Sequence, residues 1–359
     1  MIWRVALILG LGAAIAFVVA ARGPKTRAFT DVDGGAPRVV TLEFPDLADE
    51  GRDGRSVPLK IHCPVGDGPF PLLVYSHGGL GSWDAHLYEA QFMAGHGYVV
   101  VCIEHVYSNA AKGRDYVRQA RGSLRERFDY ALQRITHDPQ TVLERPGDVS
   151  FAIDQAVEWN QGDPQLKGRI DTEKIAVLGH SFGAYTTLVA CGAQPILDHL
   201  DPAVPPGEGL AGDLSDPRIM VGVAMSPQGP GSWGLGAESY GTIDRPLLCF
   251  SGSNDDMYAY DGSTLPATVR LQAFEALPPG DKYFLWLDKA DHFSFADNPK
   301  AHLFPPPARA DTQRILQPMT LAFCDAYLKD GADAKARLTE DYANSLCGDV
   351  VTQVTWYEK

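Results

Sequence analysis

A serine between two glycines is the clearest chemical feature of this chain. The stretch 174–186 reads KIAVLGHSFGAYT, in which an apolar, β-branched run leads into Gly179, Ser181 and Gly183 and a helical pattern follows at once. In this strand–turn–helix context a G-x-S-x-G motif predicts a sharp turn that lifts the serine clear of a sheet. The helix behind the turn supplies backbone N–H groups and a positive dipole end. The pattern therefore indicates that Ser181 is a nucleophile for a carbonyl carbon.

Such a serine needs a base to take its proton and an acid to orient the base. In this arrangement the chain order is serine, acid, histidine. Three histidines follow the serine: His199 in an irregular loop, His302 in a proline-bounded stretch, and His292 just after an apolar strand-like run. A loop that leaves the last strand is the expected place for the base. We therefore expect His292 to be the base.

The acid is expected in a loop at the carboxyl end of a strand between the serine and the histidine. The apolar run 247–250 leads into Ser-Gly-Ser-Asn-Asp-Asp, which offers Asp255 and, one residue on, Asp256. Asp255 follows Gly252 in a Gly-x-x-Asp pattern and is the favoured candidate, with Asp256 as the alternative. Asp291 is a poorer choice because the side chains of adjacent loop residues rarely meet with the required geometry.

A tetrahedral intermediate also needs two N–H donors for its oxyanion. One comes from the residue after the nucleophile, here Phe182, and the other from a loop after an early strand. The run 72–76 leads into His-Gly-Gly-Leu-Gly, and glycine frees the backbone to turn an N–H toward the site. We expect Gly79 to be the second donor, and His77 to hold this loop by hydrogen bonding.

These residues require a sheet that brings strand ends together. Apolar runs that fit strands alternate with helical periodicity, which predicts an α/β protein. The sheet is expected to be mainly parallel and eight-stranded, with helices on both faces and an antiparallel edge at its start. The expected strands are 39–44, 57–63, 71–76, 98–104, 174–178, 219–225, 246–250 and 282–287. The expected helices are 85–95, 148–159, 182–190, 268–276 and 311–328.

The length alone allows two domains, but one catalytic domain over residues 28–359 with insertions fits equally well and is our expectation. The chain has 359 residues, of which 45% are hydrophobic. Two insertions, at about 107–145 and 197–217, interrupt the pattern; either could contribute to a cap, and we favour a surface loop for the second. The formal net charge is −14, and no basic stripe with interleaved aromatic residues is present, so a nucleic-acid partner is not expected.

The N-terminal segment 1–27 looks like a signal peptide or membrane anchor. Residues 5–21 form an apolar run with basic residues on both sides, shorter than the roughly 20 residues of a full membrane span. The protein is therefore expected to be exported, to a periplasmic or extracellular location, or attached to a membrane through residues 5–21. In an oxidising compartment a Cys324–Cys347 disulfide is one alternative, free thiols the other. The sequence leaves the oligomeric state open.

Four segments together resemble the platelet-activating factor acetylhydrolase and dienelactone-hydrolase-like branch of the α/β-hydrolases. They are SHGGLG (76–81), AGHGYVVVCIEH (94–105), IDTEKIAVLGHSFGAYTTL (170–188) and ADHFSFAD (290–297). The resemblance implies that Ser181 is the nucleophile and His292 the base, with the amides of Gly79 and Phe182 as oxyanion donors. In the acetylhydrolases the acid follows the strand after the nucleophile helix, but the matching stretch 225–228 here has no carboxylate.

The function these observations predict is a serine carboxylic-ester hydrolase that acts on short-chain or small esters through an acyl-enzyme. It needs no metal or organic cofactor, and its partner is a small-molecule ester. An amidase or peptidase would use the same triad, and a polyester or lipid hydrolase is a narrower version of the same activity. A non-catalytic binding protein on this fold fits least, because the nucleophile and the base are both present.

Overall fold

The computed structural model describes residues 27–30, 39–202, 207–259, 263–297 and 306–359. The expected leader, 5–21, lies outside them. In the part of the chain that is described, no helix is long and apolar enough to cross a membrane.

A ten-stranded sheet runs through the centre of the molecule, in the order β1-β2-β5-β7-β6-β8-β9-β10-β13-β14. The strands of this sheet are β1 (Arg27–Thr30), β2 (Val39–Phe44), β5 (Leu59–Pro64), β6 (Phe70–Ser76), β7 (Val99–Ile103), β8 (Ile170–His180), β9 (Ile219–Met225), β10 (Leu247–Asn254), β13 (Lys282–Asp291) and β14 (Val354–Glu358). Strands β7 to β13 pair in parallel along this order, and the strands toward both edges pair antiparallel. The α/β-hydrolase fold and the antiparallel edge are therefore confirmed. The predicted number of eight strands was too small, because β1 and β14 extend the edges.

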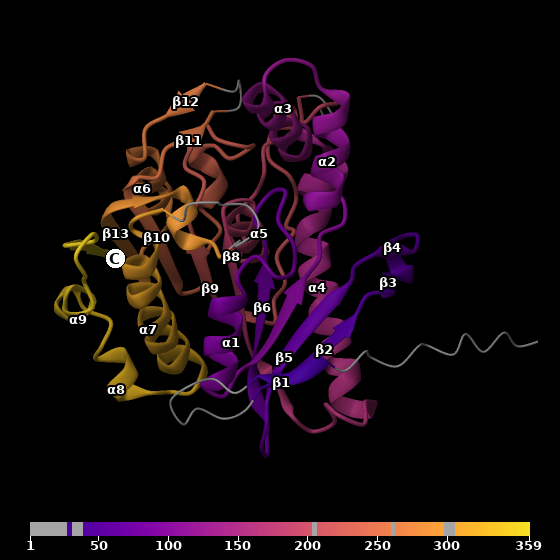
Figure 1. Cartoon of the computed structure of the whole chain (residues 1–359), viewed down its shortest axis with the longest axis vertical. Helices are drawn as coiled ribbons and strands as arrows, with labels where there is room; N and C mark the ends of the chain where they lie inside the picture. The colour runs from indigo at the N-terminus through magenta and orange to yellow at the C-terminus, as the bar shows by residue number, and fades with distance from the viewer. Residues whose placement is uncertain (1–26, 31–38, 203–206, 260–262, 298–305) are drawn as a thin grey trace, which may run out of the picture.

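Helices cover both faces of the sheet (Figure 1). Helices α4 (Pro139–Gly162), α5 (Phe182–Ala190) and α6 (Thr268–Ala276) bury apolar side chains in the core on one face. Helices α1 (Leu87–Gly95) and α7 (Arg309–Leu328) do so on the other. Two short helices, α8 (Ala332–Lys335) and α9 (Glu340–Ser345), precede the last strand. The apolar residues of the strands and helices thus form two separate hydrophobic cores, one on each face of the sheet.

The first insertion is helical throughout most of its length. Helices α2 (Ala110–Gln119) and α3 (Leu124–His137) form a hairpin, and Figure 1 shows it at the top of the molecule, as it does the β11 (Met257–Tyr258) and β12 (Thr264–Leu265) hairpin. Ser123 caps α3 with a capping box, which explains where that helix begins. In the second insertion, the described residues are mostly irregular, apart from a short 3₁₀ helix, Leu197–His199.

Helix α4 begins earlier than the predicted helix 148–159, and it contains Pro146. A proline lacks the N–H that would bond to the carbonyl four residues earlier. That carbonyl, on Val142, instead accepts a hydrogen bond of 3.3 Å from the hydroxyl of Tyr185 in the neighbouring helix. A tertiary contact therefore replaces the local one, and the helix continues through the proline.

The remaining elements are short and lie in the connections between the longer ones. They are β3 (Ala48–Asp49), β4 (Arg55–Ser56), and the 3₁₀ helices η1 (Glu50–Arg52), η3 (Ala237–Tyr240) and η4 (His292–Phe295). All six cysteines are described and free. Cys324 is a fully buried residue of α7, and the thiol of Cys347 faces Asn344 at 3.7 Å, so the alternative of a disulfide between them is not realised.

Candidate active site

Ser181 occupies the turn between β8 and α5 in a strained backbone conformation, with φ 58° and ψ −120°. The flanking glycines are required by close packing. A Cβ on Gly179 would lie 2.2 Å from the carbonyl oxygen of Gly183, and a Cβ on Gly183 would lie 1.9 Å from that of Ser76. No side chain fits at either place. The turn therefore has the sharp geometry that the motif predicts, and Ser181 is 6% exposed at its tip.

His292 is the first residue after β13 and begins the short helix η4. Its Nε2 lies 2.9 Å from the hydroxyl oxygen of Ser181. The loop is held from two sides. The Nε2 of His180 lies 2.9 Å from the carbonyl oxygen of His292, and the carboxylate of Asp291 accepts hydrogen bonds from the backbone N–H groups of Phe293 and Ser294. The carboxylate of Asp291 thus caps the loop and does not orient the imidazole. His302 lies outside the described residues.

Asp255, in the loop after β10, is fully buried, and its Oδ1 accepts a hydrogen bond of 2.8 Å from Nδ1 of His292. Its other oxygen accepts one of 2.9 Å from the hydroxyl of Ser251. The carboxylate of Asp256 faces elsewhere and accepts the N–H of Ala267, at 3.0 Å. Of the two adjacent candidates, the structure brings Asp255 to the imidazole.

Arg270 completes this side of the site, although no sequence signal distinguished it from a surface residue of helix α6. It is almost fully buried, and its Nη2 lies 2.9 Å from Oδ1 of Asp255. Its other donors bind the carbonyl oxygens of Asp255 and of two residues after β9, Ser226 and Pro227. Burial disfavours the charged form of Asp255, but Arg270 and then His292 outweigh it and lower the pKa of this carboxyl. Asp255 is therefore ionised beside the imidazole.

The stretch after β9 lacks the carboxylate that the acetylhydrolase pattern places there. Its residues instead support the site through amide and carbonyl groups. The carbonyl of Ser226 accepts from Arg270 at 2.8 Å, and the side-chain amide of Gln228 donates to the carbonyl of Ser181 at 2.9 Å. The end of β9 therefore supplies no catalytic acid in this chain, and its residues hold Arg270 and the backbone of Ser181 in place.

The two expected oxyanion donors lie beside each other. Gly79 borders the same cavity as Ser181 and His292, and a Cβ built on Gly79 would lie 3.8 Å from that of Phe182. Neither backbone N–H is engaged in a hydrogen bond with the rest of the described chain. Both are therefore available to an oxyanion at Ser181.

His77 supports the loop that carries Gly79. Its Nδ1 lies 2.6 Å from the carbonyl oxygen of Gly78, and its Nε2 accepts the backbone N–H of His105 at 3.1 Å. Burial lowers the pKa of His77 well below its usual range, so the ring is neutral and has one donor and one acceptor. This is the loop-holding role expected from the sequence.

A cavity of about 310 Å³ opens over these groups. Helix α3 contributes Arg125, Phe128 and Leu132, and the β11–β12 hairpin contributes Met257, Tyr258 and Thr264. Trp233 forms another wall, and Leu132, Trp233 and Tyr258 separate this cavity from a neighbouring one of about 220 Å³. The first insertion therefore covers the site as a cap. Among the described residues no group of three or more His, Cys, Asp or Glu side chains is placed to hold a metal ion.

The sheet order, with a serine at the turn after a central strand, is that of the α/β-hydrolase fold. Residues 58–196 match the family model of platelet-activating factor acetylhydrolase, isoform II, which confirms the resemblance to the acetylhydrolases.

Three curated relatives illustrate the range of similar proteins. The platelet-activating factor acetylhydrolase of Cavia porcellus is 28% identical over 223 residues, 55% of this chain and 45% of that protein. The dipeptidyl aminopeptidase BIII of Pseudoxanthomonas mexicana is 25% identical over 72% of this chain and 34% of its own length. The bis(hydroxyethyl) terephthalate hydrolase of Streptomyces coelicolor is 31% identical over 24% of this chain and 28% of its own. The chain thus spans less than half the length of each of these relatives.

Proposed function

We propose that this protein is a serine carboxylic-ester hydrolase that works through a Ser181–His292–Asp255 triad and an acyl-enzyme. One observation carries the proposal: the imidazole of His292 bridges the Ser181 hydroxyl at 2.9 Å and the Asp255 carboxylate at 2.8 Å, at the floor of a cavity. The similarity of residues 58–196 to the acetylhydrolase family supports hydrolysis as the reaction type.

In the proposed acylation step, the carboxylate of Asp255 accepts Nδ1–H of His292 and so leaves Nε2 unprotonated to face the serine. Nε2 takes the Ser181 proton while the oxygen attacks the ester carbonyl. The oxygen of that carbonyl gains negative charge, which the N–H groups of Gly79 and Phe182 stabilise. His292 then returns the proton to the departing alcohol. The bond to the alcohol breaks and an acyl group remains on Ser181.

Deacylation repeats the sequence with water as the nucleophile. Nε2 of His292 removes a proton from the water, the resulting hydroxide attacks the acyl carbon, and the same two N–H groups stabilise the second oxyanion. Collapse of this intermediate releases the acid and returns the proton to Ser181. Asp255 stays ionised throughout, held by Arg270 and buried away from solvent.

A cavity of about 310 Å³ favours small or short-chain esters. Its lining is mixed: Phe128, Leu132, Trp233 and Met257 are apolar or aromatic, and Arg125 brings a charge to the mouth. The triad itself would also serve a peptidase or a hydrolase of terephthalate esters, the activities named for two of the relatives. Relative rates on esters, anilides and a terephthalate ester distinguish these substrate classes.

The test compares the purified protein with Ser181→Ala on p-nitrophenyl esters of increasing acyl length, on aminoacyl p-nitroanilides and on bis(hydroxyethyl) terephthalate. We expect ester turnover that declines as the acyl chain lengthens, and a loss of at least about 10⁴-fold in kcat in the variant. A fluorophosphonate probe should label only the protein with Ser181. Equal turnover by the two proteins would contradict the mechanism, and faster cleavage of the anilides would reassign it as a peptidase.

A further inference from the structure

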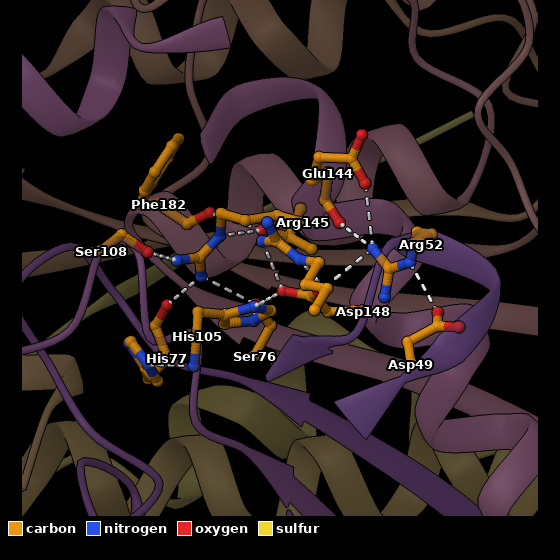
Figure 2. Close-up of polar contacts among 12 residues, drawn as sticks. Asp49, Arg52, Ser76, His77, His105, Ser108, Glu144, Arg145, Asp148 and Phe182 are labelled. Atoms are coloured by element: carbon orange, nitrogen blue, oxygen red, sulfur yellow. Dashed lines mark hydrogen bonds and ion pairs between the residues drawn. The ribbon is translucent and has the colours of Figure 1, made fainter. Parts of the chain in front are cut away.

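A buried arginine from helix α4 lies beneath the candidate oxyanion hole. Arg145 is fully buried, and its guanidinium reaches two segments that the hole requires (Figure 2). Toward the Gly79 loop, Nη2 donates to the carbonyl of His77 and, at 3.0 Å, to the hydroxyl of Ser76. Toward the nucleophile helix, Nε donates to the hydroxyl of Thr186 at 2.8 Å.

These contacts fix the Gly79 peptide from both sides. His77 comes before the glycine pair, and its carbonyl is held directly. After the pair, the N–H of Leu80 binds the carbonyl of Ser108 at 2.8 Å, and the hydroxyl of Ser108 accepts Nη1 of Arg145 at 2.6 Å. Two adjacent glycines would otherwise have wide conformational freedom. One guanidinium therefore limits the orientation of the Gly79 N–H.

The same group also braces the second donor. The hydroxyl of Thr186, which accepts from Arg145, itself donates to the carbonyl of Phe182 at 2.9 Å. The guanidinium carbon lies 4.5 Å from the centre of the Phe182 ring, a cation–π distance. Both halves of the hole are thus tied to one planar guanidinium group.

The charge of Arg145 is not matched within the described residues. All four of its acceptors are neutral oxygens. The nearby carboxylate of Asp148 is already engaged by a two-point contact with Arg55, by Arg52 at 2.9 Å and by His105 at 2.8 Å. Burying a cation without an ion-pair partner is costly, which points to a use for its charge.

We propose that Arg145 is a positioning residue of the oxyanion hole: it holds the N–H groups of Gly79 and Phe182 in one geometry and keeps a buried positive charge beside the forming oxyanion. This inference rests on the esterase function proposed above. A residue in this role acts on the transition state and leaves substrate binding almost unchanged.

The test compares Arg145→Lys and Arg145→Met with Arg55→Lys as the matched control. Arg55 is also a buried arginine of this cluster, but it contacts Asp148 and Tyr107 and makes no contact with the hole. The readouts are kcat and KM for p-nitrophenyl acetate, the melting temperature, and the inhibition constant of an alkylboronic acid, whose boron adds the Ser181 oxygen to form a tetrahedral anion.

For Arg145→Lys we expect kcat to fall by about 10- to 100-fold, with KM within threefold of the wild type. The boronic acid should bind more weakly by the same factor as kcat falls. Arg55→Lys should lower the melting temperature comparably and leave kcat and the inhibition constant within threefold. If Arg145→Met fails to fold, Arg145→Lys, which keeps a cation in place, decides the matter.

Unchanged kcat and boronic acid affinity in Arg145→Lys, despite a melting temperature as low as that of the control, would overturn the inference. So would a rise in KM with kcat unchanged. Failure of the underlying function is distinguishable, because the wild-type protein would then hydrolyse no ester faster than Ser181→Ala does.

Discussion

Asp255 and Asp256 are neighbours in the sequence, yet their carboxylates lie in different surroundings. Asp255 is fully buried against His292 and Arg270, whereas Asp256 caps the backbone at Ala267. A strand-end pattern of Gly-x-x-Asp points to the first of them but cannot exclude the second. The choice follows from how the loop turns after β10, since only one of two consecutive side chains faces the imidazole.

Asp255→Asn should lower kcat by about 10³- to 10⁴-fold, because the amide stabilises the wrong tautomer of His292 and leaves Arg270 without its carboxylate. Asp256→Asn should keep kcat within about threefold, since an amide oxygen can still accept the N–H of Ala267. Steady-state kinetics on one p-nitrophenyl ester compare the two variants. A severe loss in the second variant alone would move the proposed acid to Asp256.

The burial and the roles of Arg270 and Arg145 cannot be inferred from their residue type. An arginine in a helix is usually a surface residue, but each of these two is buried and each holds a loop of the site. Neither could have been selected from the sequence, because their partners lie far along the chain and are mostly carbonyl and hydroxyl groups, which every sequence contains.

At the scale of elements, the local sequence pattern predicts some helices correctly, whereas the position of others depends on tertiary contacts. The helices 182–190 and 268–276 were predicted with the ends that the structure shows, because turn glycines or loop residues bound them. The sequence of the insertion 107–145 indicates only a charged and partly helical segment. Its helix α3 covers the cavity with Arg125, Phe128 and Leu132, a placement that depends on packing against α2 and α4.

Trp233 lies between two cavities. It lines both the cavity of about 310 Å³ over Ser181 and the neighbouring one of about 220 Å³. Trp233→Ala should join the two spaces and raise the ratio of kcat/KM for p-nitrophenyl hexanoate to that for the acetate by about tenfold. This factor corresponds to the burial of about two of the four additional methylenes, at about 0.8 kcal/mol each.

The control for this prediction is Trp286→Ala, in strand β13, which removes an indole that borders neither cavity. It should change stability without changing the ratio. An unaltered acyl preference in Trp233→Ala would mean that the acyl group does not extend toward that wall.

At the scale of the whole molecule, several histidines among the described residues are buried. Burial lowers the pKa of five of them, to about 4 for one, to about 3 for two and well below the usual range for the others: His62, His86, His105, His77 and His180. Each is neutral in the folded state, while an unfolded histidine binds a proton below about pH 6.5. The unfolded state therefore binds more protons as the pH falls, and stability is lost from about pH 6.5 downward.

Each such histidine contributes a slope of up to about 1.4 kcal/mol per pH unit to the free energy of unfolding. Glu89 acts with the opposite sign, because burial raises its pKa to about 8 and its contribution to stability is lost as the pH rises from about 4.5 to 8. We expect urea unfolding at pH 7.0 and 5.5 to show a marked loss of stability at the lower pH.

Two variants separate these contributions. His86→Phe, which places a ring in the same slot against Tyr75, should make the dependence shallower, and Glu89→Gln should make it steeper. A stability that is equal at both pH values in the wild type, or slopes that move in the reverse directions, would show that these groups are not buried in their neutral forms.

The sequence by itself determined the order of the central strands and of the helices between them, the nucleophile turn at Ser181 and the short lists from which His292 and Asp255 came. Such features are local: apolar periodicity, two glycines without which the turn cannot pack, and residues placed at strand ends. Only the tertiary structure decided which of two adjacent aspartates meets the imidazole, which insertion covers the cavity, and that two arginines lie beneath the site. These features depend on contacts between segments distant in sequence, which have no periodicity or spacing in the chain.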